Sequence, residues 1–146
     1  MWYSKILVAY DGSAPADKAV EIASEMAESR QDARIVFAHV LKIADCGAGD
    51  FAVSQAICGD AKEISAKLEK LAAPFGERAE VRLLKGSSPA SLIVRCCKEE
   101  GCDVIVMGSR GMGGVKGYLG SVSNAVLRES DVCVVIAKAD RTERNR

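Results

Sequence analysis

The stretch DVIVMGSRGMGGVKGYLGS, residues 103–121, decides the fold. It opens with a predicted strand at 103–107, and the continuous apolar character after Asp103 indicates burial on both faces. A glycine-dense loop follows, and Gly120-Ser121 begins a predicted helix over 121–129. Glycine loses much backbone entropy when it is ordered, so a run this dense favours a loop whose backbone approaches a ligand. The stretch therefore predicts a strand–loop–helix unit that can bind an anion.

Strands alternate with helices along the rest of the chain. Short apolar runs predict further strands at residues 4–10, 34–41, 79–84 and 132–137. Apolar residues at helical spacing predict a helix from the cap Ser13 to about Ser29, and another from Ile57 to Leu71, before Pro74. A further helix is predicted from Pro89, with Ser88 as its cap, to about Glu100. Gly101 is predicted to end it in the left-handed conformation. This βαβαβαβαβ order predicts an α/β fold: a single-domain, five-stranded parallel sheet with helices on both faces, of the Rossmann-like kind.

Length and charge limit the function classes. The 146 residues predict one domain over 1–146, with a frayed polar tail at 139–146. Lys plus Arg and Asp plus Glu both total 20, so no net charge attracts nucleic acid or an anionic membrane. No apolar run approaches the roughly 20 residues of a spanning helix, and the N-terminus lacks a secretory pattern. We expect a cytoplasmic protein without nucleic-acid or membrane partners.

The six cysteines predict reduced structural thiols. They are Cys46, Cys58, Cys96, Cys97, Cys102 and Cys133. No CxxC pair occurs and His39 is the only imidazole, so no metal site is expected. Cys133 lies in an apolar run and is predicted to be a small core residue. Redox sensing by Cys46 or Cys58 is the alternative.

The glycine loop fits neither common phosphate-loop spacing. Lys116 is followed by Gly117, so GxxxxGK[ST] fails, and the dinucleotide fingerprint lacks its last glycine. The context still favours anion binding, because the first amides of a helix lack intrahelical partners and carry positive dipole character. Ser121 and Ser123 can add hydroxyl donors, and Arg110 and Lys116 can add charge. The alternative is a plain flexible connection between strand and helix.

Three segments resemble the universal stress protein family. They are ILVAYDGS at 6–13, AHV at 38–40, and DVIVMGSRG at 103–111 followed by GSVSNAVL at 120–127. The resemblance covers nearly the whole chain and implies a five-stranded parallel α/β fold, similar to that of adenine nucleotide alpha-hydrolases. The ATP-binding branch of the family carries the loop G-x2-G-x9-G-[ST]. Gly108 and Gly111 fit this pattern, but eight residues precede Gly120-Ser121, so the loop is one residue short.

The resemblance implies a site for ATP, or for AMP or ADP, with or without Mg²⁺ bound to the phosphates. The implied base and ribose positions are Ala9, Asp11, Val40, Met107 and Gly108. The implied phosphate cradle is Gly111, Gly120, Ser121, Val122 and Ser123. Two further candidates are Ser13, because its helix start faces the same cleft, and Arg110, because it can add positive charge. Alternatively Asp11 organises its turn and Ser13 only caps a helix, and we expect His39 to serve packing.

The function expected from these residues is a nucleotide-binding regulatory protein of the stress response. No catalytic set is visible, and Asp11 is the only acid clearly near the site, where phosphoryl transfer usually needs acids that hold Mg²⁺. At most a weak ATPase is therefore expected. The apolar strand 132–137 predicts a homodimer paired through this edge, as in the family, and an unknown protein client. Two alternatives remain: a slow Mg²⁺-dependent ATP hydrolase, and a nucleotide-free dimeric interaction module, which the shortened loop favours.

Overall fold

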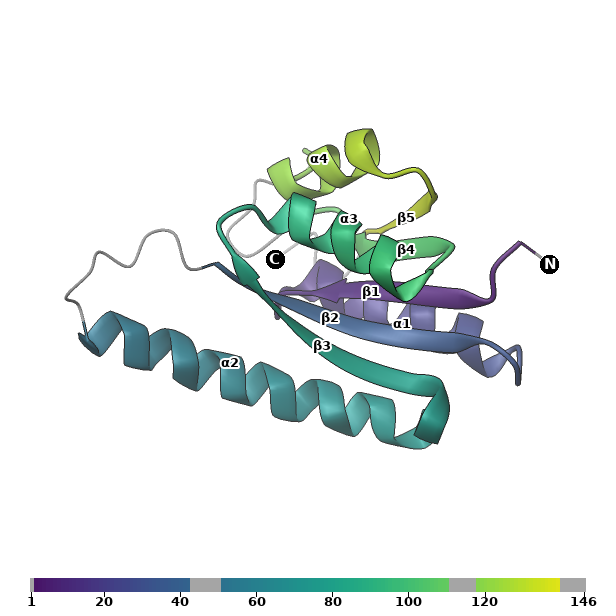
Figure 1. The fold of residues 1–146 in the computed structure, drawn as a ribbon, viewed down its shortest axis with the longest axis horizontal. Helices are drawn as coiled ribbons and strands as arrows, with labels where there is room; N and C mark the ends of the chain where they lie inside the picture. The colour runs from purple at the N-terminus through teal and green to yellow at the C-terminus, as the bar shows by residue number, and fades with distance from the viewer. Residues whose placement is uncertain (1, 43–50, 111–117, 140–146) are drawn as a thin grey trace.

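The computed structural model describes residues 2–42, 51–110 and 118–139, and their side chains except at 42 and 51–60. It is a five-stranded parallel sheet with the order β3-β2-β1-β4-β5 (Figure 1). The strands are β1 (Lys5–Tyr10), β2 (Arg34–Lys42), β3 (Ala79–Gly86), β4 (Val104–Gly108) and β5 (Cys133–Ala137). The helices are α1 (Ala14–Glu28), α2 (Phe51–Ala72), the 3-10 helix η1 (Ala73–Arg78), α3 (Pro89–Glu100) and α4 (Ser121–Glu129). The predicted fold class is confirmed.

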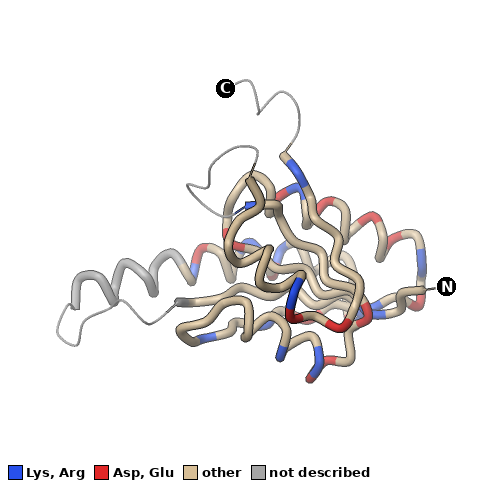
Figure 2. Tube along the Cα trace, turned by 90° about the horizontal axis from the view of Figure 1, so that it is seen from above, with Lys and Arg blue, Asp and Glu red and all other residues tan. Residues whose placement is uncertain are grey.

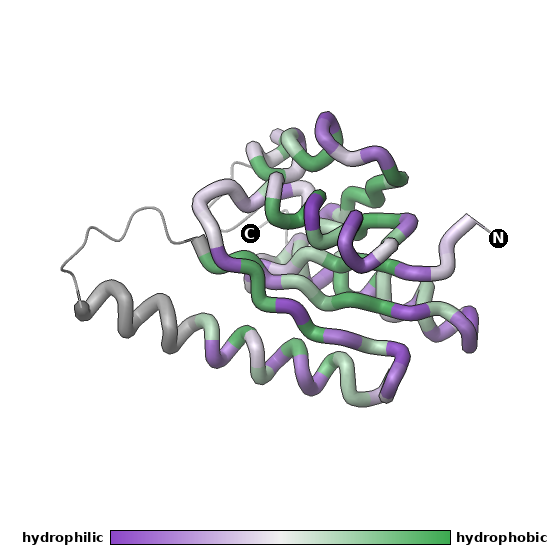
Figure 3. The backbone as a smooth tube through the Cα atoms, in the orientation of Figure 1, coloured by the Kyte–Doolittle hydropathy of each residue, from purple (hydrophilic) through white to green (hydrophobic). Residues whose placement is uncertain are grey.

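The sheet is covered on both faces. Side chains alternate along each strand, so Ile6 and Val8 pack with α1 and α2 while Leu7 packs with α3 and α4. All of β4 is buried, which confirms the doubly buried strand predicted from its apolar run. Figure 3 shows hydrophobic residues concentrated along the central strands, and hydrophilic residues alternating with hydrophobic ones along the helices. Burial of these two apolar layers is the main stabilising contribution to the fold.

Local signals set most helix ends. The Ser13 hydroxyl accepts from the Ala16 amide (3.2 Å) and caps α1, as predicted. Gly101 ends α3 in the left-handed conformation (φ 68°), which also confirms the prediction. Ser88 is the N-cap residue of α3, as predicted, but its hydroxyl makes no capping bond and donates to Ser91 Oγ (3.1 Å). Helix α3 still begins at Pro89, because proline fits the first helical position.

The strand order places a switch point between β1 and β4. From β1 the chain builds outward through β2 and β3, and then returns to the other side of β1 for β4 and β5. In open parallel sheets, ligands bind beyond the carboxyl ends of the strands at such a point. Pairing of β1 with β2 ends at Tyr10–His39, whereas β2 continues beside β3 through Lys42. The short central strand leaves room at this edge.

The amino end of the sheet is held by polar side chains. The Asp103 carboxylate accepts from the Ser4 amide (2.8 Å), the Ser4 hydroxyl (2.9 Å) and the Lys5 amide (3.2 Å). Lys5 Nζ donates to Glu100 (3.0 Å), and Arg82 also pairs with Glu100. The hydrogen bond from Lys5 is the main reason why the pKa of Glu100 lies below its usual value. Figure 2 shows most of the Lys, Arg, Asp and Glu residues on the helices and at strand ends.

The thiols differ from the prediction at one position. Cys96, Cys97 and Cys102 are free and buried, as expected of structural thiols. Cys133 was predicted to lie in the core, and this is wrong: it is exposed, because β5 is an edge strand. Cys46 lies outside the described residues, as does the side chain of Cys58.

Other expectations concern metals, membranes and the tail. Among the described residues, no group of three or more His, Cys, Asp or Glu side chains could hold a metal ion. Likewise, none of the helices within these ranges is long and apolar enough to cross a bilayer. Ala139, the first residue of the predicted tail, is buried, and the remainder (140–146) lies outside the described ranges.

Candidate functional site

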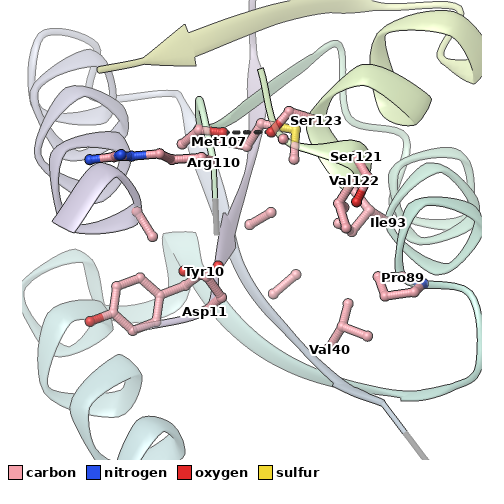
Figure 4. Close-up of a pocket in the computed structure, with 15 residues that line it drawn as sticks. Tyr10, Asp11, Val40, Pro89, Ile93, Met107, Arg110, Ser121, Val122 and Ser123 are labelled. Atoms are coloured by element: carbon pink, nitrogen blue, oxygen red, sulfur yellow. Dashed lines mark hydrogen bonds between the residues drawn. The ribbon is translucent and has the colours of Figure 1, made fainter. Parts of the chain in front are cut away.

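A cavity of about 390 Å³ opens at the carboxyl end of the sheet (Figure 4). It lies at the switch point, and its walls come from β1, β2, β4, the start of α1, and the N-terminal turns of α3 and α4. Its volume falls in the range of small-molecule sites, roughly 300–1,000 Å³. The topology therefore puts a ligand-sized space where this sheet architecture is expected to have one.

Apolar side chains from three strands form one part of the cavity wall. Ala9 from β1, Ala38 and Val40 from β2, and Met107 from β4 line it, and Ile93 of α3 contributes from above the sheet. The two alanines are small, so the middle of the sheet leaves space that larger residues would fill. This part of the cavity suits a flat apolar group.

The N-terminus of α4 forms another part of the wall. Ser121, Val122 and Ser123 line the cavity, and the first backward bond of the helix runs from the Asn124 amide to the Gly120 carbonyl (2.9 Å). The three preceding amides have no intrahelical acceptor, as in any helix start. They carry the positive end of the helix dipole. This end of the cavity therefore suits an anionic group.

Backbone bonds close the two ends of the glycine loop. The Gly120 amide donates to the Ser109 carbonyl (2.7 Å), and the Ser109 amide donates to the Ala137 carbonyl (2.8 Å). The Ser123 hydroxyl donates to the Gly108 carbonyl (2.7 Å), so its proton is used within the protein. These bonds hold the start of α4 beside the end of β4.

Gly108 is required by close packing. A Cβ at this position would lie 2.8 Å from the carbonyl carbon of Pro15 and 2.9 Å from the Ala16 nitrogen. The end of β4 thus lies directly against the first turn of α1. Any side chain here would separate the two elements and change the shape of the cavity.

Asp11 has a structural task in the turn after β1. Its Oδ1 accepts from the Ser13 amide (2.9 Å), which confirms the turn-organising role considered from the sequence. The side chain is also exposed and lies at the cavity, so its other oxygen can meet a ligand.

The side chains of Tyr10 and His39 make hydrogen bonds within the protein at the carboxyl ends of β1 and β2. Figure 4 shows the Tyr10 phenol pointing away from Val40 and Ile93. The phenol donates to Asp17 (2.7 Å) and accepts from Lys67 (2.6 Å), and burial raises the pKa of Tyr10. His39 Nδ1 donates to the Tyr10 carbonyl (2.8 Å) within the core, which confirms the packing role predicted for it.

Ten of the predicted site residues line this one cavity. They are Ala9, Asp11, Val40, Met107, Gly108, Arg110, Gly120, Ser121, Val122 and Ser123. Ser13 does not line it and serves as the α1 cap. Gly111 lies outside the described residues, as does Lys116. Figure 4 shows the Arg110 guanidinium directed away from Ser121 and Val122, so Arg110 lines the cavity without reaching across it.

Sequence reasoning missed five lining residues. They are Tyr10, Ala16, Ala38, Pro89 and Ile93. Ala38 could have been found, because it lies two residues before Val40 and shares its face of the strand. Pro89 and Ile93 depend on how α3 crosses the sheet, and no local pattern predicts that angle.

A comparison with protein families identifies the chain. The model of the universal stress protein family matches residues 3–138. The chain belongs to the universal stress protein family. A universal stress protein of Bacillus subtilis, YxiE, is 31% identical over 149 residues, which cover 93% of this chain and 99% of the relative.

Solved structures of the family share the fold. A universal stress protein from Lactobacillus plantarum superposes with a TM-score of 0.79 at 20% identity, covering 94% of this chain and 99% of that one. A family member from Arabidopsis thaliana with AMP bound has a TM-score of 0.72 at 21% identity, covering 96% and 94%. Another universal stress protein, in complex with cAMP, has a TM-score of 0.71 at 24% identity, covering 96% and 100%.

Proposed function

We propose that this universal stress protein binds an adenine nucleotide in the cavity at the carboxyl end of β1, β2 and β4, as a regulatory component of the stress response. One observation carries the proposal: a single cavity joins an apolar wall to the open amides of a helix N-terminus. A nucleotide has this same division, with a flat base at one end and phosphate at the other. The AMP and cAMP bound by two family members support the choice of adenine.

The base would lie against Ala9, Val40 and Met107. These side chains offer apolar surface on the α3 and α4 side of the sheet. Beyond His39, β2 continues without β1 as a neighbour, so backbone groups of this extension can bond to the edge of the base. Asp11, beside them, would accept from the ribose hydroxyls.

The phosphates would bind at the start of α4. The amides of Ser121, Val122 and Ser123 are suitable donors, and the helix dipole favours negative charge there. Mg²⁺ would enter with ATP on its phosphates, because Asp11 is the one carboxylate among the described lining residues. We therefore propose binding of ATP, ADP or AMP as the function of the site.

Calorimetric titration of nucleotide-stripped protein tests this proposal. ATP with and without Mg²⁺, AMP and cAMP should bind saturably, and GMP serves as the control for the base. Ala9→Leu would fill the apolar part of the cavity and should weaken adenine-nucleotide binding at least about tenfold, or 1.4 kcal/mol. The matched change Ala14→Leu, at an exposed position outside the cavity, should leave the affinity unchanged.

Two results would contradict the proposal. One is the absence of both heat and thermal stabilisation at millimolar nucleotide, since a ligand that binds only the folded state must stabilise it. The other is equal affinity in Ala9→Leu and the wild type. In the first case, a nucleotide-free interaction module would be the better account.

We also propose that the protein forms a homodimer through β5. This strand is an edge strand, carries no charged residue, and is half-buried at Val134, Val135 and Ile136 in the single chain. An apolar edge of this kind favours pairing with another strand. Sedimentation should show a dimer, and Cys133→Lys should convert it to a monomer. The control Leu127→Lys, at an exposed position of α4, should leave the dimer intact. A monomeric wild type would contradict the dimer.

A further inference from the structure

Two cysteines occupy the paired positions of the motif that ends α3. The Cys102 amide donates to the Cys97 carbonyl (2.9 Å), and the Gly101 amide donates to the Lys98 carbonyl (3.2 Å). With Gly101 left-handed, these bonds form a Schellman motif. In this motif the side chains at the Cys97 and Cys102 positions usually meet in an apolar contact. Here that contact is made by two thiols.

Two hydrogen bonds join Cys97 to Cys102. The Cys97 thiol donates to the Cys102 carbonyl (3.4 Å), in addition to the backbone bond between the same residues. The next residue, Asp103, is fixed by its bonds to the Ser4 and Lys5 amides at the start of β1. These bonds hold the two cysteines next to each other at the C-terminus of α3.

The environment distinguishes the two sulfurs. A hydrogen bond between the thiols lowers the pKa of Cys97 and raises that of Cys102. Cys97 is thus the thiol that loses its proton first, and the thiolate is the reactive form. The neighbouring Cys96 differs, because burial raises its pKa to about 11.

We propose that Cys97 and Cys102 are a redox pair that forms a reversible disulfide within the chain. The oxidant is hydrogen peroxide, since the two residues are only 3% and 6% exposed and larger oxidants are excluded. Once Cys97 has released its proton, its thiolate attacks one peroxide oxygen and the O–O bond breaks. The leaving hydroxide takes up the released proton and becomes water. Cys102 then attacks the sulfenic sulfur, the S–O bond breaks, and the Cys102 proton leaves in a second water. Two thiols lose two electrons and the peroxide gains them.

This pair adds a function apart from the nucleotide site. Helix α3 contributes Pro89 and Ile93 to the cavity through its first turns, whereas the pair lies at its opposite end, before β4. Oxidation would join the last turn of α3 covalently to the residue that leads into β4.

Peptide mapping of the whole folded chain tests the pair. The protein is treated with hydrogen peroxide, unfolded, alkylated with iodoacetamide and digested with trypsin without reduction. The wild type should yield residues 96–98 linked to 99–110, lacking two hydrogens and with Cys97 and Cys102 unalkylated. Dithiothreitol should restore both thiols and leave the circular dichroism spectrum unchanged.

Cysteine variants assign the link. Cys97→Ser and Cys102→Ser should lose the linked peptide, and the matched control Cys96→Ser should keep it. The proposal is overturned if both thiols of the oxidised wild type remain open to alkylation, or if Cys97 gains oxygen atoms in place of the link. It is also overturned if Cys97→Ser keeps the link. The wild-type result decides the matter even where a variant fails to fold.

Discussion

The polar groups at the two ends of the sheet differ in whether they have partners within the protein. At the amino end, Asp103 accepts from the backbone of Ser4 and Lys5, and Glu100 pairs with two cations. At the carboxyl end, the amides at the start of α4 border a cavity of about 390 Å³. The first end uses its polar groups to join strands and helices. The second keeps donors available beside an apolar wall.

This difference separates stability from binding. Side chains at the amino end contribute to the free energy of folding and lie far from the cavity along the strands. Substitutions at the start of α4 can change binding with little cost to the fold, because the amides of residues 121–123 have no intrahelical acceptor. Variants at each end should therefore affect one property and leave the other unchanged.

The largest effect is expected from Asp103→Ala. The change removes the acceptor of the Ser4 and Lys5 amides and should lower the free energy of unfolding by about 2 kcal/mol. Urea denaturation measures this loss, and calorimetry should show unchanged nucleotide affinity in the remaining folded protein. Asp103→Asn keeps one acceptor oxygen and should lose less. A weakened affinity in Asp103→Ala would break the separation of the two ends.

The next effect is expected at the start of α4. Ser121→Pro deletes one open amide while preserving the helix, because proline suits the first helical position and the extended Gly120 (φ −64°, ψ 157°) tolerates a following proline. Nucleotide affinity should fall about tenfold, or 1.4 kcal/mol. Ser121→Ala removes the hydroxyl and keeps the amide, so it is the matched control. Equal affinities in the two variants would show that this amide does not hold phosphate.

A smaller effect is expected from Glu100→Gln, with a defined pH dependence. The pKa of Glu100 is lowered in the folded state, so its ion pairs stabilise the protein above the unfolded pKa of about 4.3. This stabilisation is lost as the pH falls through the folded pKa. At pH 7 the variant should be less stable by about 1 kcal/mol. Urea midpoints of variant and wild type should converge in acid, and a constant difference would contradict the assignment.

The smallest effect is expected from Lys67→Met, behind the cavity. Lys67 bonds to Tyr10 and Asp17, but its pair with Asp17 is about half exposed (52% and 53% of the side chains). Exposed pairs contribute little, so the loss of stability should be about 0.5 kcal/mol. Thermal unfolding measures it. Affinity should be unchanged, because the Tyr10 phenol points away from the cavity, and a clear loss of binding would place this cluster in the site.

Local patterns predicted the elements well, and tertiary packing explains the errors. Apolar runs marked β1, β2, β4 and β5, and Ser13, Gly101 and Ser121 marked helix ends, because these signals act within a few residues. Cys133 was misplaced because an apolar edge strand has the same sequence pattern as a central one. Ile93 was missed because its place at the cavity depends on the packing of α3.

The site was predictable only where it follows strand ends. Asp11, Val40 and Met107 lie at the ends of parallel strands, which always meet at one edge of a sheet. The direction of a long side chain is not fixed by such a rule. Arg110 was expected to offer charge to phosphates, and its guanidinium is directed away from Ser121.

An NMR titration of the ¹⁵N-labelled wild type with AMP compares both ends of the sheet in one sample. The account predicts saturable shifts of the amide resonances of Ser121, Val122 and Ser123, with those of Ser4 and Lys5 unchanged. Shifts at the amino end with none at the start of α4, or no shifts at millimolar AMP, would contradict the claim that the carboxyl end is the nucleotide site.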